Sequence, residues 1–258
     1  MRYRLAALKS KHRTAMELKR LDPSLRRNLK DLLDGYLEHC QVSRHLMARI
    51  DFPIYYHGFK FGAPIFTHSD PRHEAEDQKV IGLLGVNTPD SQVPADILLQ
   101  LIEILVQQPN LAEASILRVL PVANPVALEL GEHAPALSDW PILEHLVSKF
   151  QAQSADGMLE VVVADEEYAL EGSASVALFQ TLEKITSPDG KKPFALQPDA
   201  IRLTPVSGGV PWHVRLSVPA TWTESAKVHS VARFIARLIG AFTSRLDSSP
   251  DARNSQRA

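Results

Sequence analysis

The sequence predicts an α/β three-layer sandwich, in which a mixed, largely parallel central sheet is flanked by helices. The apolar run at 79–86 is continuous rather than alternating, which is typical of a strand covered on both faces, and the apolar segments at 115–122 and 158–164 are predicted as further strands. Segments with helical apolar spacing lie between these runs. Strand and helix therefore alternate along the middle of the chain, as they do in proteins built on a parallel sheet.

The helices are predicted from apolar residues that recur every three or four positions along one face. Such spacing is found at 13–50, 93–105, 139–153, 173–185 and 228–246.

Other segments carry strand or turn signals. β-rich stretches punctuated by Gly and Pro lie at 52–59 and 63–68, and a late strand is expected at 213–218. Residues 125–139 are expected to form a polar loop, because Asn124-Pro125 breaks the preceding strand. Ser91 is a candidate cap for the helix that follows it.

No Gly/Ser-rich linker and no internal repeat divides the chain, so we expect one α/β domain over 51–246. Residues 1–50 are expected to form a helical segment that packs on this domain. The polar end, 247–258, is expected to be a disordered tail.

Composition excludes several classes of protein. The 258 residues include 45% apolar and 22% charged residues, so disorder is excluded as the main state. A single cysteine, Cys40, excludes an intramolecular disulfide framework and a Cys-rich zinc module. A net charge of −2 gives no case for a nucleic-acid or anionic-membrane partner. No apolar run approaches the roughly 18 residues of a membrane span, and the start lacks a signal-peptide core, so a cytoplasmic protein is expected.

Two turns after predicted strands carry a family resemblance. Residues 85–91 read GVNTPDS before a helix, and residues 121–125 read PVANP. With the order of elements over about residues 50–245, they resemble the zinc metallocarboxypeptidases, in particular the short branch with succinylglutamate desuccinylase and aspartoacylase. The resemblance implies a zinc-peptidase-like, phosphorylase/hydrolase-like fold and a zinc-dependent carboxypeptidase or deacylase activity.

The residues that carry this family's chemistry are replaced here. Asn87 stands at the zinc-binding His, Asp90 at the zinc-binding Glu and Ala164 at the third ligand. His133 replaces the substrate-binding Arg, and Ser217 or its neighbour occupies the place of the catalytic Glu. One good ligand cannot hold zinc tightly, and an unaided Ser hydroxyl cannot act as a base at neutral pH. We therefore expect no catalytic residue and no bound zinc or other cofactor.

The sequence instead predicts a catalytically inactive scaffold with a retained cleft. That cleft would bind a small molecule, a peptide or a protein partner. The expected lining residues are Asn87, Asp90, Asn124, His133, Asp165 and Glu166.

Two alternatives stay open. An active metal-dependent hydrolase could use a displaced site, with ligands drawn from His68, Asp70, His73, Asp90, Asp165 or Glu166. An interaction module could act through the basic N-terminal helix at 13–37. His213, beside Trp212, is interpreted as a structural histidine.

Overall fold

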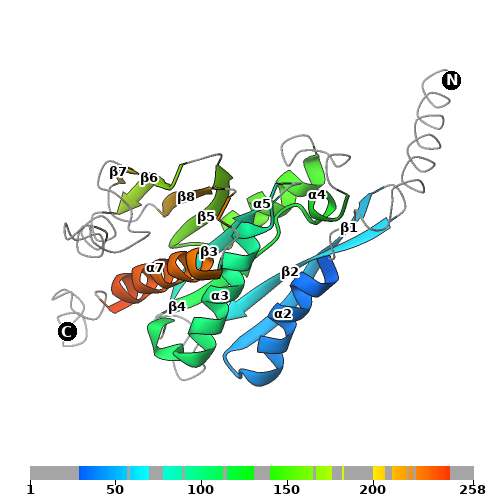
Figure 1. Ribbon diagram of the computed structural model, residues 1–258, viewed down its shortest axis with the longest axis horizontal. Helices are drawn as coiled ribbons and strands as arrows, with labels where there is room; N and C mark the ends of the chain where they lie inside the picture. Colours follow the sequence, from blue (N-terminus) through cyan, green and yellow to red (C-terminus); the bar gives the residue numbers. More distant parts are fainter. Residues whose placement is uncertain are drawn as a thin grey trace, which may run out of the picture.

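The computed structural model contains one mixed sheet with helices on both of its faces (Figure 1). It describes residues 29–56, 59–69, 78–88, 91–112, 115–130, 140–164, 167–175, 182, 200–206, 211–219, 221–222 and 225–244. The predictions for 1–28 and for the tail lie outside these residues. The predicted three-layer α/β sandwich is confirmed.

The described strands are joined in the order β1-β2-β4-β3-β5-β8-β6-β7. Their bounds are β1 Leu46–Tyr56, β2 Phe59–His68, β3 Lys79–Val86, β4 Ser115–Leu120, β5 Gly157–Ala164, β6 Ala169–Ser175, β7 Ile201–Val206 and β8 Trp212–Pro219. The central strands β4, β3, β5 and β8 are parallel. The β1–β2, β2–β4 and β6–β8 pairs are antiparallel, and β6 and β7 are parallel. Three of these four parallel strands, β4, β3 and β5, therefore coincide with the apolar segments at 115–122, 79–86 and 158–164.

Helices cover both faces of this centre. The described helices are α2 Leu29–Val42, α3 Val93–Gln107, α4 Pro125–Leu130, α5 Pro141–Ala152, α7 Ser225–Ser244 and the 3-10 turn η3 Pro109–Ala112. Apolar residues of α2, α3 and α7 share one core cluster, and those of α5 belong to the other. Leu83 and Leu84 of β3 fall in different clusters, because successive side chains of a strand point to opposite faces.

Tyr36 anchors α2 to this architecture. Its ring stacks on Phe66 of β2 with a centroid separation of 4.8 Å, and its hydroxyl donates to the carbonyl oxygen of Ala95 in α3. Neither α2 nor any other described helix has the length and apolarity needed to cross a membrane.

Three predicted elements have different bounds in the structure. The helix expected over 13–50 ends at Val42, because β1 begins at Leu46 and pairs with β2. The polar loop expected over 125–139 begins with the short helix α4. The helix expected over 173–185 is wrong at its start, because Ser173–Ser175 complete β6. Two of these errors have one physical cause: strand pairing between distant segments overrides local apolar spacing.

The predicted cap of α3 is displaced by one residue. Gln92 occupies the cap position and makes no side-chain capping bond. The Ser91 hydroxyl nevertheless accepts a hydrogen bond of 3.3 Å from the Val93 N–H, so it satisfies one of the free donors of the first turn.

Candidate functional site at the carboxyl edge of the sheet

The carboxyl ends of β4, β3 and β5 lie next to one another at one edge of the sheet. Leu84 of β3 pairs with Leu120 of β4, and Val86 pairs with Val162 of β5. Because the strands are parallel neighbours, their carboxyl ends form one edge, which is the ligand-binding edge in α/β proteins. The turns after β3 and β4 thus come together, and the end of β5 lies beside them.

Asn87, the first residue after β3, joins two of these turns through its side-chain amide. Its Nδ2 donates hydrogen bonds to the carbonyl oxygens of Gly85, at 3.3 Å, and Pro121, at 3.0 Å. Both amide N–H groups are used in this way, and the two acceptors fix the orientation of the amide. The residue is only 6% exposed, and its Oδ1 has no donor among the described residues. Asn87 is therefore a buried crosslink between the ends of β3 and β4.

Residue 85 must be a glycine because the turn after β4 approaches β3 so closely. The Ala123 N–H donates to the Gly85 carbonyl oxygen at 3.0 Å. A Cβ on Gly85 would overlap the carbonyl oxygen of Pro121. The same close approach brings Pro121 within reach of Asn87.

Asn124 has a structural role at the start of α4. Its Oδ1 accepts a hydrogen bond of 2.9 Å from the Ala127 N–H, and its carbonyl oxygen accepts one of 3.3 Å from the Leu128 N–H. This is the arrangement of an N-cap residue, and substitution of such caps typically destabilises by about 1 kcal/mol. The Asn-Pro turn noted in the sequence therefore begins a helix.

The ends of β5 and β8 lie beside this edge. Ala164 of β5 pairs with Pro219 of β8, and Val162 pairs with Ser217. Ala164 offers only a methyl group, and Ser217 offers a buried hydroxyl. Neither carries the nitrogen, sulfur or carboxylate donor that zinc prefers.

Four of the six predicted cleft residues, Asp90, His133, Asp165 and Glu166, lie outside the described residues. Of the ligands considered for a displaced metal site, Asp70 and His73 also lie outside them. The other two predicted cleft residues, Asn87 and Asn124, are both buried at the same edge.

His68 lies at the opposite end of the strands from Asn87. It pairs with Leu117 of β4, which in turn pairs with Ile81 near the start of β3. Asn87 is about six residues further along β3, which is a separation of roughly 20 Å. His68 and the carboxyl edge therefore cannot share one metal ion.

An aromatic pair lies at the carboxyl end of β8, and it is not among the cleft residues predicted from the sequence. The rings of Tyr168, just before β6, and Trp222, just after β8, have centroids 4.7 Å apart. Lys227 Nζ lies 5.9 Å from the Trp222 ring centroid. Burial raises the pKa of the Tyr168 hydroxyl well above its ordinary value. The sequence signal was an aromatic residue beside each strand end, but only the antiparallel β6–β8 pairing brings the two together.

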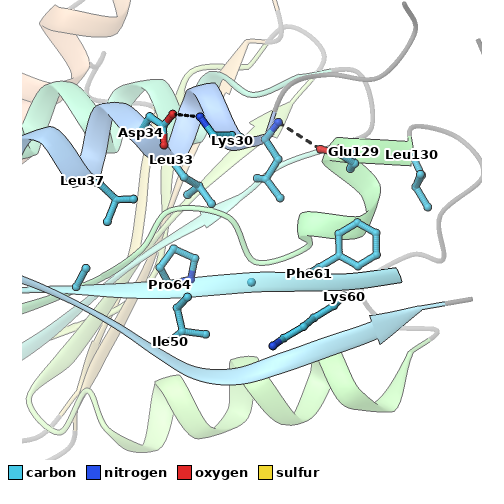
Figure 2. A pocket seen from close by; sticks show the side chains of 13 residues that line it. Lys30, Leu33, Asp34, Leu37, Ile50, Lys60, Phe61, Pro64, Glu129 and Leu130 are labelled. Atoms are coloured by element: carbon cyan, nitrogen blue, oxygen red, sulfur yellow. Dashed lines mark hydrogen bonds and ion pairs between the residues drawn. The ribbon is translucent and has the colours of Figure 1, made fainter. Parts of the chain in front are cut away.

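A cavity lies away from this edge, between α2, the β1–β2 hairpin and α4 (Figure 2). Its volume is about 560 Å³, and most of the residues that line it are apolar. Asn87 and Asn124 are not among them.

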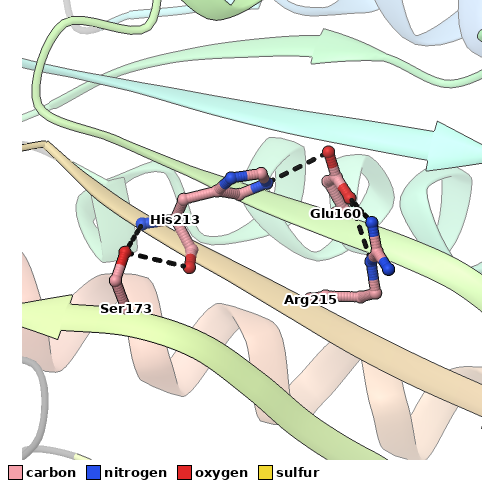
Figure 3. Close-up of polar contacts among 4 residues, drawn as sticks. All are labelled: Glu160, Ser173, His213 and Arg215. Atoms are coloured by element: carbon pink, nitrogen blue, oxygen red, sulfur yellow. Dashed lines mark hydrogen bonds and ion pairs between the residues drawn. The ribbon is translucent and has the colours of Figure 1, made fainter. Parts of the chain in front are cut away.

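An ion-pair cluster crosses one face of the sheet from β5 to β8 (Figure 3). The buried carboxylate of Glu160 accepts hydrogen bonds from His213 Nε2 at 3.0 Å and from Arg215 Nε at 3.2 Å and Nη2 at 3.1 Å. Burial alone would raise the pKa of Glu160, but the hydrogen bond and charge of His213 and the charge of Arg215 outweigh it and lower the pKa. His213 thus has the polar partner expected of a structural histidine.

The described residues at the carboxyl edge do not fit a catalytic zinc ion. The Asn87 nitrogen is bonded to two carbonyl groups, its free oxygen is a neutral amide donor, and Ala164 has no donor. Across the described part of the chain, no three His, Cys, Asp or Glu side chains gather as metal ligands would. The chemistry that these residues support is hydrogen bonding.

No protein-family model matches the sequence, and no curated protein does. Solved structures do match. The metallo-carboxypeptidase from Burkholderia cenocepacia aligns with a TM-score of 0.57 at 10% identity, over 86% of this chain and 70% of that one. The metallo-carboxypeptidase from Pseudomonas aeruginosa aligns with a TM-score of 0.56 at 10% identity, over the same 86% and 70%. Carboxypeptidase A from Helicoverpa armigera aligns with a TM-score of 0.54 at 9% identity, over 88% of this chain and 75% of that one.

This chain has a metallocarboxypeptidase-like fold. At these identities the likeness concerns the fold alone, because unrelated activities share common folds. The metallocarboxypeptidase-like topology nevertheless agrees with the resemblance read from the two strand-end turns.

Proposed function

We propose that this chain is a non-catalytic metallocarboxypeptidase-like protein, a degenerate relative of the desuccinylase and aspartoacylase branch. Its carboxyl edge serves as a cleft for a small molecule, a peptide or a protein partner. One observation carries the proposal: the Asn87 amide donates to the carbonyl oxygens of Gly85 and Pro121. The residue at the position of a zinc ligand therefore acts as a structural crosslink.

The chemistry of the neighbouring positions supports the same proposal. Hydrolysis by zinc needs about three good ligands and an open position for water. Ala164 supplies no ligand, and Ser217 supplies no base that works at neutral pH. Without the third zinc ligand and the catalytic base, the remaining polar groups at this edge can form hydrogen bonds but cannot catalyse hydrolysis by zinc.

Asn87 also offers a contact for a ligand. Its Oδ1 is a buried acceptor without a donor among the described residues. An unmet acceptor of this kind destabilises a fold by about 1–3 kcal/mol, so a donor N–H or O–H from a bound molecule would be stabilising. A ligand with an amide or hydroxyl donor fits this atom.

Calorimetric zinc titration of the full chain tests the proposal. We expect no stoichiometric binding tighter than about micromolar, because tighter binding needs several good ligands. Elemental analysis of freshly purified protein should find less than one equivalent of zinc. Stoichiometric zinc, or an amidase activity removed by chelators, would contradict the proposal.

The double variant Asn87→His/Ala164→His is the matched control for this titration. It places imidazoles at the two positions where the resemblance expects zinc-binding histidines. Two imidazoles, with Asp90 as a third ligand, should raise zinc affinity at least about tenfold over the wild type. A gain in zinc affinity would show that the side chains at positions 87 and 164 limit zinc binding in the wild type. Equal zinc affinities of the double variant and the wild type would show that these two positions do not share a site.

A further inference from the structure

The cavity beside α2 does not include the residues of the carboxyl edge, and it is lined mainly by two surfaces, with a smaller contribution from α4. One surface is α2, through Leu33 and Leu37, and the other is the β1–β2 hairpin, through Ile50 and Pro64. Figure 2 shows the α2 side chains facing the hairpin across the space. Its volume of about 560 Å³ falls in the range of small-molecule sites, roughly 300–1,000 Å³. The site thus has the size and the apolar lining of a ligand pocket.

Four charged side chains, two lysines and two carboxylates, are among the lining residues of this cavity. Lys30 Nζ lies 2.6 Å from Asp34 Oδ2, so these two charges neutralise each other. Glu129 Oε2 accepts a hydrogen bond of 3.3 Å from the Leu29 N–H at the start of α2. Lys60, on β2, is exposed and has no carboxylate partner within the described part of the chain. Lys60 is therefore the one cation of the described lining without a carboxylate partner, whereas the Glu129 carboxylate is bound at the start of α2, where the helix dipole favours negative charge.

We propose that this cavity binds an amphiphilic anion, namely an acyl chain that ends in a carboxylate. The acyl chain would lie between α2 and the hairpin, where burial of each CH₂ group is favourable. The carboxylate would remain at the rim beside Lys60. The proposal rests on the cavity and on Lys60, which is unpaired among the described residues, and it is independent of the function proposed for the carboxyl edge.

Calorimetry on the full-length protein, with three probes of equal alkyl length, tests which head-group charge the cavity prefers. The probes are decanoate, decan-1-ol and decylammonium. We expect decanoate to bind with one-to-one stoichiometry, decan-1-ol to bind more weakly and decylammonium to bind most weakly. Absence of one-to-one decanoate binding, or tighter binding of decylammonium, would overturn the proposal.

Two lysine variants locate the carboxylate. Lys60→Met should weaken decanoate binding roughly two- to fivefold, which is the range of an exposed ion pair, and should leave decan-1-ol binding unchanged. Lys60→Arg keeps the charge and should bind decanoate as the wild type does. Equal decanoate affinity in Lys60→Met and wild type would remove Lys60 from the site and overturn the assignment.

Gly62→Leu tests whether the acyl chain lies in the cavity. A Cβ on Gly62 would meet only Ile50 Cδ1, at 3.6 Å, which is an ordinary contact. The variant should therefore fold, while its longer side chain fills the cavity and weakens decanoate binding at least about tenfold. An unchanged melting temperature with unchanged decanoate binding would overturn the proposal. If the wild type proves to be a dimer in solution and Gly62→Leu a monomer that still binds decanoate, the groove is an interface between copies and the proposal is overturned.

Discussion

The side-chain nitrogen of Asn87 lies 3.0 Å from the carbonyl oxygen of Pro121, so one residue fastens the end of β3 to the turn after β4. The same amide nitrogen bonds the Gly85 carbonyl oxygen. The sequence placed this residue at the edge where a related zinc peptidase would hold its metal. The observed bonds give it a role in stability that needs no ligand.

Asn87→Ala should destabilise the fold by about 1–3 kcal/mol, because it removes two buried hydrogen bonds and leaves the Pro121 carbonyl oxygen without this donor. Urea unfolding, with an unchanged m-value, measures the difference. The control is Asn110→Ala, an exposed position on η3, which should change stability by less than about 0.5 kcal/mol. Equal stabilities of the two variants would show that the crosslink is dispensable.

Gly85→Ala should destabilise more strongly than a change of one methyl group suggests. The added Cβ would overlap the Pro121 carbonyl oxygen, which belongs to backbone and cannot rotate away. We expect a loss of about 2–3 kcal/mol in the free energy of unfolding. Gly62→Ala is the matched control, because its Cβ would have only an ordinary contact at 3.6 Å. Similar losses in the two variants would contradict the close approach of β3 to the turn.

The central sheet could be predicted because its strands carry their own signal. Buried parallel strands are rich in apolar residues on both faces, so β3, β4 and β5 can be recognised without knowledge of their neighbours. Their carboxyl ends then define one edge by topology alone. The sequence alone therefore predicts that Asn87, which directly follows β3, lies at this edge.

The β-rich stretches at 52–59 and 63–68 indicated the second half of β1 and most of β2, but β6, β7 and the first half of β1 could not be predicted because their signal is non-local. β6, ALEGSAS, has few apolar residues and is held by pairing with β8 and β7. Gly172 within it has a φ of 128°, which suits glycine and brings its backbone against the His213 carbonyl group. β1 resembles a helix locally, because Leu46, Met47 and Ile50 have helical spacing. The secondary structure of such segments is determined by the strands with which they pair, and the local spacing of apolar residues does not reveal that pairing.

The stability conferred by Glu160 should disappear in acid. Its pKa is lowered in the folded state, from an ordinary value of 4.5, because His213 and Arg215 stabilise the carboxylate more than burial disfavours it. The stabilisation is therefore fully present above about pH 4.5 and is lost as pH falls through the lowered pKa. Glu160→Gln should lower the free energy of unfolding by about 1–2 kcal/mol at neutral pH and by little below about pH 3.

Glu171→Gln is the control for this pH dependence. Glu171 lies on β6 and pairs with Arg202 at 2.6 Å, but both side chains are more than a third exposed. Solvent screening should limit its effect to less than about 0.5 kcal/mol. If both variants had the same effect across the pH range, burial of Glu160 would not be the source of its stabilisation.

Asp96, in the first turn of α3, should have the opposite pH dependence. Burial raises its pKa to about 6 from an ordinary 3.8, although a hydrogen bond with Gln92 opposes the shift. Its protonated form is therefore favoured by folding, so this stabilisation is full below about pH 3.8 and is lost as pH rises through 6. Asp96→Asn stays neutral, and it should be more stable than the wild type by about 1–2 kcal/mol at about pH 8. The positive end of the helix dipole favours the aspartate and limits the gain.

Denaturant unfolding of Asp96→Asn and wild type at about pH 4 and about pH 8 measures this difference, which should be small at the lower pH. Asp34→Asn, at a partly exposed position of α2, is the matched control and should not show the gain at about pH 8. A variant less stable than the wild type at about pH 8 would mean that the aspartate, stabilised by the helix dipole and by Gln92, is favoured by the fold in its charged form. The first turn of α3 would then be a site that stabilises negative charge at the carboxyl edge, in conflict with the raised pKa.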